Sequence, residues 1–336
     1  MVDLSELVRA CLDAGRLAAE RIRTVQSSGN LQCVEKGDGQ DRITGRPMTD
    51  IQTEADRQSE QIIFCRLLRD FPALRIIGEE QSSGTPPDCE DMTGLSEGGV
   101  DGFNVPDNLG KLDLADISVF VDPLDGTSEF VKGRLHCVSV IIGIAYKSKA
   151  LAGVIYRPFT SPEYPNTCMY GIVGVGAFLD GRKMNSMEIP KRDRLKITTT
   201  LSKSNRIIER VYELLQPCDE AKDGGAGWKC WIVATGIVDC YQYPRPGTKR
   251  WDVLAGDAII RALGGACTDA CGRSMDYSIS QDYTNTWGIL VSLDKQWHHA
   301  KLVSSSHRAL VEASQDPSFT QWPHGLSIPP LETSSL

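Results

Sequence analysis

The sequence has no apolar run long enough to cross a membrane and no dense stripe of Lys and Arg. Its longest strongly apolar run, Val138 to Tyr146, ends at Lys147, whereas a spanning helix needs about 20 such residues. The net charge is -8 and the isoelectric point is near 5.3, which argues against a nucleic acid or an anionic membrane as partner. We expect a globular protein that needs local positive charge to hold an anionic ligand.

Cysteine pairs and zinc-type histidine patterns are also lacking. The 11 cysteines include no Cys-x-x-Cys pair, so we predict free thiols in a reducing compartment rather than a disulfide framework. The 5 histidines show no zinc-type spacing with one another or with the cysteines, and we assign them no metal role.

Signals for secretion are absent as well. The chain starts without a basic region followed by an apolar stretch, and no Asn-x-Ser/Thr site occurs, so we expect a cytoplasmic protein. The final residues, Ser334-Ser335-Leu336, loosely resemble the Ser-Lys-Leu address of peroxisomal import. Delivery to a peroxisome or glycosome is therefore the alternative.

Hydrophobic periodicity predicts a chain in which helices and sheets alternate in layers. The predicted helices cover residues 4–22, 53–71, 207–215 and 251–263, and residues 231–243 form a helix followed by a strand. Strands are predicted at 74–77, 117–121, 137–146, 151–156, 169–175, 195–200 and 288–292, and the four between 117 and 175 are expected to form one mostly antiparallel sheet. Residues 81–116 are rich in Gly, Pro, Asp, Glu and Ser, which indicates a long surface excursion. A basic, turn-like stretch places a domain boundary near residue 190.

A group of carboxylates follows the strand predicted at 117–121. Residues Asp122–Thr127 read Asp-Pro-Leu-Asp-Gly-Thr. Pro fixes one backbone torsion and Gly permits a left-handed one, so both acids and the Leu124 carbonyl can converge on a hard cation, which prefers oxygen ligands. The amides after Gly126 begin a short helix whose positive end suits a phosphate. An ordinary acidic turn would have the same composition.

A second pair of acids, Glu79 and Glu80, follows the strand predicted at 74–77. The chain contains neither a Gly-x4-Gly-Lys-Ser/Thr motif nor a dinucleotide fingerprint, which argues against a P-loop. Metal ions must therefore organise any phosphate chemistry.

Three separated motifs resemble those of one enzyme family. Gly78–Glu80, Asp122–Thr127 and Trp251–Asp252 are similar to the motifs of the lithium-sensitive, magnesium-dependent phosphomonoesterases of the inositol monophosphatase superfamily. Within it the chain most resembles the 3'(2'),5'-bisphosphate nucleotidases, through Met48–Arg57, Ile197–Thr200, Gly224–Gly227 and Pro246–Asp252. The resemblance implies an α+β fold, a layered α/β/α/β/α sandwich. It also implies an N-terminal domain, 1–190, with most metal ligands and a C-terminal domain, 191–330, with the nucleotide contacts and the last ligand.

The resemblance further implies a set of metal ligands and a proton acceptor. The ligands of two or three Mg²⁺ ions would be four carboxylates and one backbone carbonyl, those of Glu79, Asp122, Asp125, Asp252 and Leu124. Thr127, oriented by Asp56, would take a proton from the water that attacks phosphorus. By itself, Asp56 is better explained as part of a helix cap, since it follows Thr53 by three positions.

The substrate contacts implied by the resemblance are Gly126, Thr127, Thr200, Lys203, Gly225 and Lys229. Lys229 would supply a point charge for the 5'-phosphate. Lys203 departs from the family pattern, because relatives commonly carry His there. Trp228 also departs, and it either stacks on adenine or packs against the core or an interface. Residues 224–227 alone indicate no more than a flexible turn.

The function implied is hydrolysis of the 3'-phosphate of adenosine 3',5'-bisphosphate, with the 5'-phosphosulfate analogue as a further candidate substrate and lithium as an inhibitor. Such an activity would serve sulfur assimilation or sulfotransfer. The alternative is an inositol polyphosphate 1-phosphatase or inositol monophosphatase, because the metal core is shared. A nucleotide- or lithium-sensing protein without turnover is a further class, which the presence of Asp56, Thr127 and every acidic ligand disfavours. The oligomeric state is left open.

Overall fold

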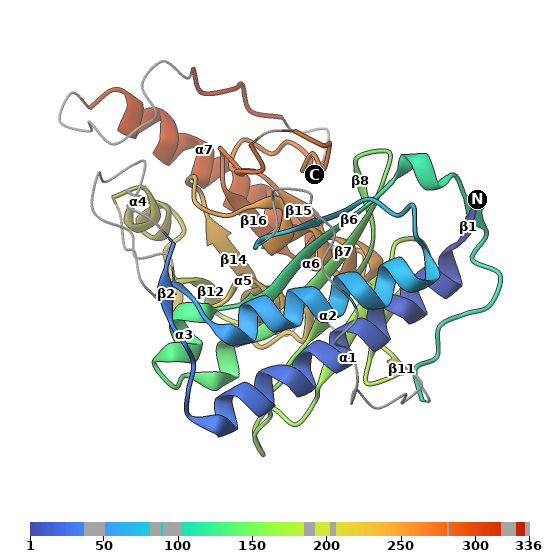
Figure 1. The fold of residues 1–336 in the computed structure, drawn as a ribbon. Coiled ribbons are helices and arrows are strands. Elements are labelled where there is room, and N and C mark those ends of the chain that lie inside the picture. Colours follow the sequence, from blue (N-terminus) through green and yellow to red (C-terminus); the bar gives the residue numbers. More distant parts are fainter. Residues whose placement is uncertain are drawn as a thin grey trace.

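The computed structural model describes residues 1–36, 51–80, 89, 102–184, 192–201, 206–280, 282–316 and 327–332. Two β-sheets and their helices form five layers in these ranges (Figure 1). Helices α1 and α2 cover one face of a seven-stranded sheet, α5 and α6 lie between this sheet and a five-stranded sheet, and α4 and α7 form the last layer. The predicted layered α+β fold is confirmed.

The first layer consists of α1 (Leu4–Ser28) and α2 (Glu54–Asp70), which lie side by side (Figure 1). The Asp3 side chain caps α1 by accepting a hydrogen bond from the Ser5 amide at 2.9 Å. Thr53 caps α2, and the Asp56 carboxylate accepts from the Thr53 amide at 2.7 Å. Because each cap satisfies amides that have no partner within the helix, both helices begin where the sequence predicts.

The seven-stranded sheet has the strand order β11-β10-β9-β8-β7-β6-β4, antiparallel except for the parallel pair of β4 and β6. Its strands are β4 (Ile76–Gly78), β6 (Ile117–Asp125), β7 (Ser139–Tyr146), β8 (Lys149–Tyr156), β9 (Cys168–Ile172), β10 (Gly176–Leu179) and β11 (Arg182–Lys183). Every residue of β6 is buried, because helices cover both faces of the sheet.

The predicted carboxyl end of the strand that begins at Ile117 is wrong. The predicted strand stops at Val121, whereas β6 continues through Asp125 and its pairing with β7 shifts between Asp122 and Asp125. The two acids therefore lie on a bulged strand, where one extra residue changes the direction of the side chains that follow. Smaller corrections concern the strand predicted at 74–77, which lies at 76–78, and the strand predicted to end at 175, which ends at Ile172.

The five-stranded sheet has the order β13-β12-β14-β16-β15. Its strands are β12 (Leu195–Thr200), β13 (Cys218–Asp223), β14 (Cys240–Tyr243), β15 (Ala266–Thr268) and β16 (Ile289–Ser292). The helices of this half are α4 (Arg206–Leu214), α5 (Ala226–Ala234), α6 (Arg250–Ala262) and α7 (Ala300–Ser314), with η3 (Lys295–His299) before α7. Helix α6 packs on β7, β8 and β9 as well as on β15 and β16. The division into domains 1–190 and 191–330 stays a prediction.

Shorter elements complete the described chain. Strand β1 (Val2–Asp3) pairs with β5 (Lys111–Leu112), and β2 (Val34–Glu35) pairs with β3 (Ile51–Gln52). The 3-10 helices are η1 (Leu114–Asp116) and η2 (Leu135–Cys137), and the predicted short helix after Gly126 is α3 (Thr127–Val131). Of the surface excursion predicted at 81–116, the structure describes residue 89 and residues 102–116. The C-terminal tripeptide 334–336 lies outside the described residues. No helix among the described residues is long and apolar enough to cross a membrane.

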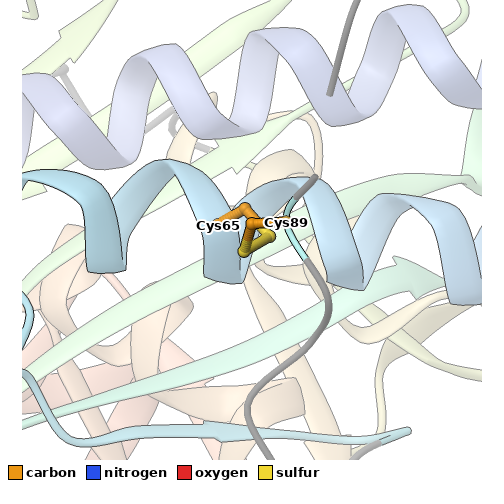
Figure 2. The surroundings of a disulfide bond; sticks show 2 residues. All are labelled: Cys65 and Cys89. Carbon is orange, nitrogen blue, oxygen red and sulfur yellow. A yellow bond between two sulfur atoms is a disulfide. The ribbon is translucent and has the colours of Figure 1, made fainter. Parts of the chain in front are cut away.

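One disulfide contradicts the prediction of free thiols. Cys65 of α2 is bonded to Cys89 with an S–S distance of 2.03 Å (Figure 2). The two cysteines are separated by 24 positions, and no Cys-x-x-Cys spacing marks them. The other nine cysteines are free, and all of them except Cys33 are buried. The buried thiols pack as small core residues.

Candidate active site

A cavity of about 260 Å³ lies where the carboxyl end of β6 meets the first turns of α3, α5 and α6. It is lined by Glu79, Asp122, Leu124, Asp125, Gly126, Thr127, Thr200, Gly225, Ala226, Lys229, Tyr241, Tyr243, Gly247, Thr248 and Asp252. Every predicted metal ligand is in this set, and so are five of the six predicted substrate contacts. The sixth, Lys203, lies outside the described residues.

Three carboxylates form the acidic centre of the cavity. Glu79 follows β4, Asp122 lies on β6 and Asp252 is in the first turn of α6. One carboxylate oxygen from each lies within 4.8 Å of the other two. Segments far apart in the sequence thus bring three oxygen donors to one point, and such a donor set suits a hard divalent cation.

The electrostatics of this cluster show why a cation fits it. Burial, with Asp252 and Glu80 as like-charged neighbours, raises the pKa of Glu79 to about 8 against the lowering effect of Lys36. Burial raises the pKa of Asp252 to about 7, and burial together with the charge of Glu79 raises the pKa of Asp122. Each carboxylate is easier to protonate than usual because it is buried and because its neighbours repel its charge. A divalent cation would remove this repulsion.

Beside the cluster, Lys36 and Glu80 form an ion pair. The Lys36 Nζ atom lies 2.6 Å from Glu80 Oε1 and 3.3 Å from Glu79 Oε1. Gln52 also donates to the Glu80 carboxylate, and the Glu80 amide donates to Glu60 at 2.9 Å. Glu80 is thus occupied by protein partners, whereas Glu79 belongs to the three-carboxylate cluster.

Thr127 and Asp56 form a hydrogen-bonded pair next to the cluster. The Thr127 Oγ1 atom lies 2.9 Å from Asp56 Oδ1 and 3.0 Å from the Leu124 carbonyl oxygen. The other oxygen of Asp56 accepts from Thr53, so the aspartate caps α2 and also orients Thr127. Burial raises the pKa of Asp56 to about 6. The two roles considered for Asp56, helix cap and partner of Thr127, therefore coexist in one side chain.

Asp125 occupies a different environment from the three-carboxylate cluster. Its Oδ1 atom accepts from the Ala226 amide at 2.7 Å, and its Oδ2 atom accepts from Ser139 Oγ at 2.8 Å and the Gly227 amide at 2.9 Å. The amides belong to the N-terminus of α5, where a negative charge is favoured. Burial raises the pKa of Asp125, opposed first by the charge of Lys229.

Glycines allow the start of α5 to approach Asp125. Gly225 has φ of 60°, and a Cβ atom there would lie 2.3 Å from the Cys137 carbonyl oxygen and 2.9 Å from Asp125 Oδ2. A larger residue would push this loop away from the carboxylate that it binds. The loop at 224–227 is therefore built to contact β6, and its glycines provide close approach.

Lys229 contacts the backbone of this loop, and its ammonium group is buried. Its Nζ atom donates to the carbonyl oxygens of Gly225 at 2.5 Å and Asp223 at 3.4 Å, and it lies 5.2 Å from the centre of the Tyr241 ring. Burial lowers the pKa of Lys229, while Asp125 raises it. The cavity thus contains one buried positive charge in addition to its carboxylates.

Trp228 packs in the core. Its side chain is buried among core residues and makes edge contacts with His136 and Tyr164, and the Arg157 guanidinium lies 4.7 Å from the indole. Trp228 does not line the cavity formed by the described residues. The structure thus favours core packing, the second of the two roles that the sequence left open.

The sequence did not reveal several residues of this site. Lys36, Ser139, Tyr241 and Tyr243 belong to no predicted motif, although each lines the cavity or contacts one of its carboxylates. Tyr241 and Tyr243 lie on the buried strand β14, where aromatic residues are ordinarily read as core. A lone lysine near a two-residue strand carries no signal of its own. Only the three-dimensional arrangement brings these residues to the carboxylates.

Comparisons with known proteins agree with this geometry. A model of the inositol monophosphatase family matches residues 3–310. The chain is 34% identical over 308 residues to 3'(2'),5'-bisphosphate nucleotidase 1 of Homo sapiens, covering 90% of this chain and 96% of the human protein. It is 29% identical to the protein of the same name from Dictyostelium discoideum, covering 90% and 98%, and 26% identical to inositol monophosphatase 3 of Danio rerio, covering 87% and 82%.

Solved structures share the fold. An IMPase from Thermotoga maritima superposes with a TM-score of 0.63 at 21% identity, covering 89% of this chain and 96% of the bacterial one. CysQ from Bacteroides thetaiotaomicron, described as a bacterial member of the inositol monophosphatase family, superposes with a TM-score of 0.60 at 22% identity, covering 87% and 98%. At these identities the likeness shows the fold alone.

Proposed function

The chain belongs to the inositol monophosphatase family, and from this membership and the site we propose that it removes the 3'-phosphate of adenosine 3',5'-bisphosphate to give AMP and phosphate. The observation that carries the proposal is the Thr127–Asp56 hydrogen bond of 2.9 Å beside the three-carboxylate cluster. The proposed proton acceptor would thus act beside the proposed cation site. The resemblance in sequence to bisphosphate nucleotidases supports the choice of substrate.

Thr127 and Asp56 act as the proton acceptor for water. Thr127 Oγ1 passes its hydrogen to Asp56 Oδ1 and accepts a hydrogen from the attacking water, whose oxygen forms the new bond to phosphorus. The bond from phosphorus to the ribose 3'-oxygen breaks on the opposite side, and that oxygen takes a proton from solvent. A pKa of about 6 for Asp56 suits a group that must hold a proton briefly near neutral pH.

The carboxylates are proposed to hold two or three Mg²⁺ ions, with Glu79, Asp122 and Asp252 as the central ligands and Asp125 and the Leu124 carbonyl as further ones. Bound Mg²⁺ supplies positive charge that offsets the carboxylates and the phosphate and lowers the pKa of bound water. Oxygen ligands alone favour Mg²⁺ over softer metals. Lithium is proposed as an inhibitor at the same carboxylates.

Lys229 is proposed to favour a second phosphate on the substrate. Its buried ammonium lies in the cavity near Gly225 and Asp125, so an anionic group at the nucleotide 5' position would find a positive charge there. Thr200, at the end of β12, lines the same cavity and is proposed to contact the nucleotide. The 5'-phosphosulfate analogue presents a comparable charge and is proposed as a second substrate.

The test is phosphate release at pH 7.5 with Mg²⁺ from adenosine 3',5'-bisphosphate, inositol 1,4-bisphosphate and inositol 1-phosphate, each with and without lithium. We expect preference for the nucleotide and inhibition by lithium. Preference for an inositol ester would transfer the function to the inositol phosphatases while retaining the metal site. No release from any of the three would instead favour a sensing protein without turnover.

A further inference from the structure

A second group of ligand atoms lies at the edge of the loop at 224–227, outside the carboxylate cluster. His136 and Cys137 are the last two residues of η2, and Asp223 is the last residue of β13. The Cys137 Sγ atom lies 3.2 Å from His136 Nε2, which lies 3.8 Å from Asp223 Oδ1. All three ligand atoms lie within 4.8 Å of one another.

These distances suit one tetrahedral metal ion. With metal–nitrogen, metal–oxygen and metal–sulfur bonds of roughly 2.0–2.3 Å, tetrahedral angles separate a nitrogen from a sulfur by roughly 3.5 Å and from an oxygen by roughly 3.4 Å. The observed separations differ from these values by about 0.4 Å or less. The third pair, Cys137 Sγ and an Asp223 carboxylate oxygen, lies within 4.8 Å, and side-chain rotation would have to bring it to tetrahedral separation.

We propose that His136, Cys137 and Asp223 bind a divalent transition-metal ion of the Zn²⁺ class, at a site separate from the carboxylate cluster. The donor types carry this assignment, because a thiolate and an imidazole favour Zn²⁺, whereas the oxygen donors of Glu79, Asp122 and Asp252 favour Mg²⁺. The two sites therefore select different metals. Three protein ligands leave a fourth position for water.

The local structure gives the metal a route to its ligands. The side chains of His136 and Asp223 are 43% and 23% exposed, whereas Cys137 is fully buried. An ion would thus arrive from the histidine side and bind the thiol last. The edge contact between the His136 and Trp228 rings, with centroids 5.8 Å apart, limits the orientations open to the imidazole. Binding displaces the thiol proton to solvent, and no other bond changes.

The site joins two segments that flank the substrate cavity. Asp223 immediately precedes the loop at 224–227, and the Cys137 carbonyl oxygen packs against Gly225, where an added Cβ would lie 2.3 Å from it. The Asp223 carbonyl also accepts from Lys229 Nζ at 3.4 Å. A metal at this site would tie η2 to the segment that positions Gly225 and Lys229.

Spacing rules could not have found this site. His136 and Cys137 are adjacent in sequence, Asp223 lies far along the chain, and no zinc-type pattern includes the three. The earlier assignment of no metal role to the histidines is therefore replaced, for His136, by this proposal. The other histidines keep that assignment.

The experiment uses Co²⁺ as a spectroscopic substitute for Zn²⁺. Full-length protein is titrated with Co²⁺ in excess Mg²⁺, and thiolate-to-cobalt charge-transfer absorption is recorded in the near ultraviolet. We expect this absorption in the wild type and its displacement by one equivalent of Zn²⁺. Cys137→Ser should abolish it. His136→Gln removes a proposed ligand and should weaken Co²⁺ binding roughly tenfold or more, since the loss of even an outer-shell partner of a ligand costs about that much.

Two controls separate this site from other metal-binding groups. Cys33→Ser removes the exposed free thiol and should leave the absorption unchanged, and Asp122→Asn, which alters the carboxylate cluster, should also leave it unchanged. The second control makes the result independent of the proposed phosphatase activity. Absence of the band in the wild type would overturn the proposal. So would a band that His136→Gln leaves at full strength and affinity, since a thiol alone would then bind the cobalt.

Discussion

Asp122 and Asp125 lie three positions apart on the same bulged strand, yet the protein treats their charges differently. Asp125 accepts three hydrogen bonds, two of them from the N-terminus of α5, and has Lys229 nearby. Within the described part of the chain, Asp122 accepts one hydrogen bond, from the Leu124 amide at 3.1 Å, and it lies in a cluster with Glu79 and Asp252. Protein groups thus offset the charge of Asp125 more fully than that of Asp122, and we infer that Asp122 depends more strongly on a bound cation.

The largest expected effect comes from Asp122→Asn. The amide retains the size of the side chain but removes the charge that repels Glu79 and Asp252. Phosphate release should fall to background, because the cation site loses a proposed ligand. Thermal unfolding of the metal-free variant at pH 8 should nevertheless occur at a higher temperature than in the wild type. A lower midpoint would contradict the description of the cluster as mutually repulsive.

Asp125→Asn should change the stability of the metal-free protein in the opposite direction to Asp122→Asn. Turnover should be lost here too, but metal-free stability should fall, because an amide cannot accept from Ser139, Ala226 and Gly227 as the carboxylate does. A buried N–H or O–H donor that loses its acceptor lowers the free energy of unfolding by about 1–3 kcal/mol. Chemical denaturation of the two variants side by side provides the measurement. Equal stabilities would remove the distinction drawn between them.

Thr127→Val should have the next largest effect. The substitution keeps the branched shape of the side chain and removes the hydroxyl that contacts Asp56, so kcat should fall roughly 10²- to 10⁴-fold. Stabilisation by Mg²⁺ should be retained, since the carboxylates are unchanged. Thr127→Ser is the matched control and should keep most of the activity. A Thr127→Val enzyme as fast as the Ser variant would exclude the proposed proton transfer.

Lys229→Ala is expected to have the smallest effect on catalysis. It should raise KM for adenosine 3',5'-bisphosphate on the order of tenfold, which corresponds to about 1.4 kcal/mol, and spare simple phosphate esters that lack a second anion. Lys229→Met, which fills more of the space, should behave in the same way if charge is the cause. Equal losses on every substrate would mean that Lys229 mainly supports the loop through Gly225 and Asp223.

Much of the fold could be predicted because local patterns and burial agree. The alternation of apolar residues, the cap at Thr53 and the buried run of β6 each depend on neighbours in sequence. Resemblance to a known family supplied Asp56, Thr127 and the acids, which the structure places at one cavity. These residues could be named from the chain alone because their motifs are short and contiguous.

The remaining features depend on contacts between distant segments. The bulge in β6 arises from its pairing with β7, and the Asp125 carboxylate is bound by amides that lie 101 and 102 positions further along the chain. The Cys65–Cys89 disulfide and the position of Lys36 beside Glu79 likewise have no local pattern. Sequence periodicity describes one element at a time and does not specify which elements meet.

The most direct test of the central claim is the unfolding temperature of the protein with and without Mg²⁺ at pH 5.5 and pH 8. The pKa of Glu79 is raised from 4.5 to about 8 and that of Asp252 from 3.8 to about 7. At pH values between the unfolded and the folded pKa of each group, the folded metal-free protein therefore binds more protons than the unfolded chain. Through these groups its stability falls as pH rises, by up to about 1.4 kcal/mol per pH unit for each extra proton bound.

Mg²⁺ replaces those protons, so the rise in unfolding temperature that it causes should be larger at pH 8 than at pH 5.5. Asp122→Asn should reduce that difference. An equal rise at both pH values in the wild type would contradict the claim that the carboxylate cluster depends on a cation for its balance of charge.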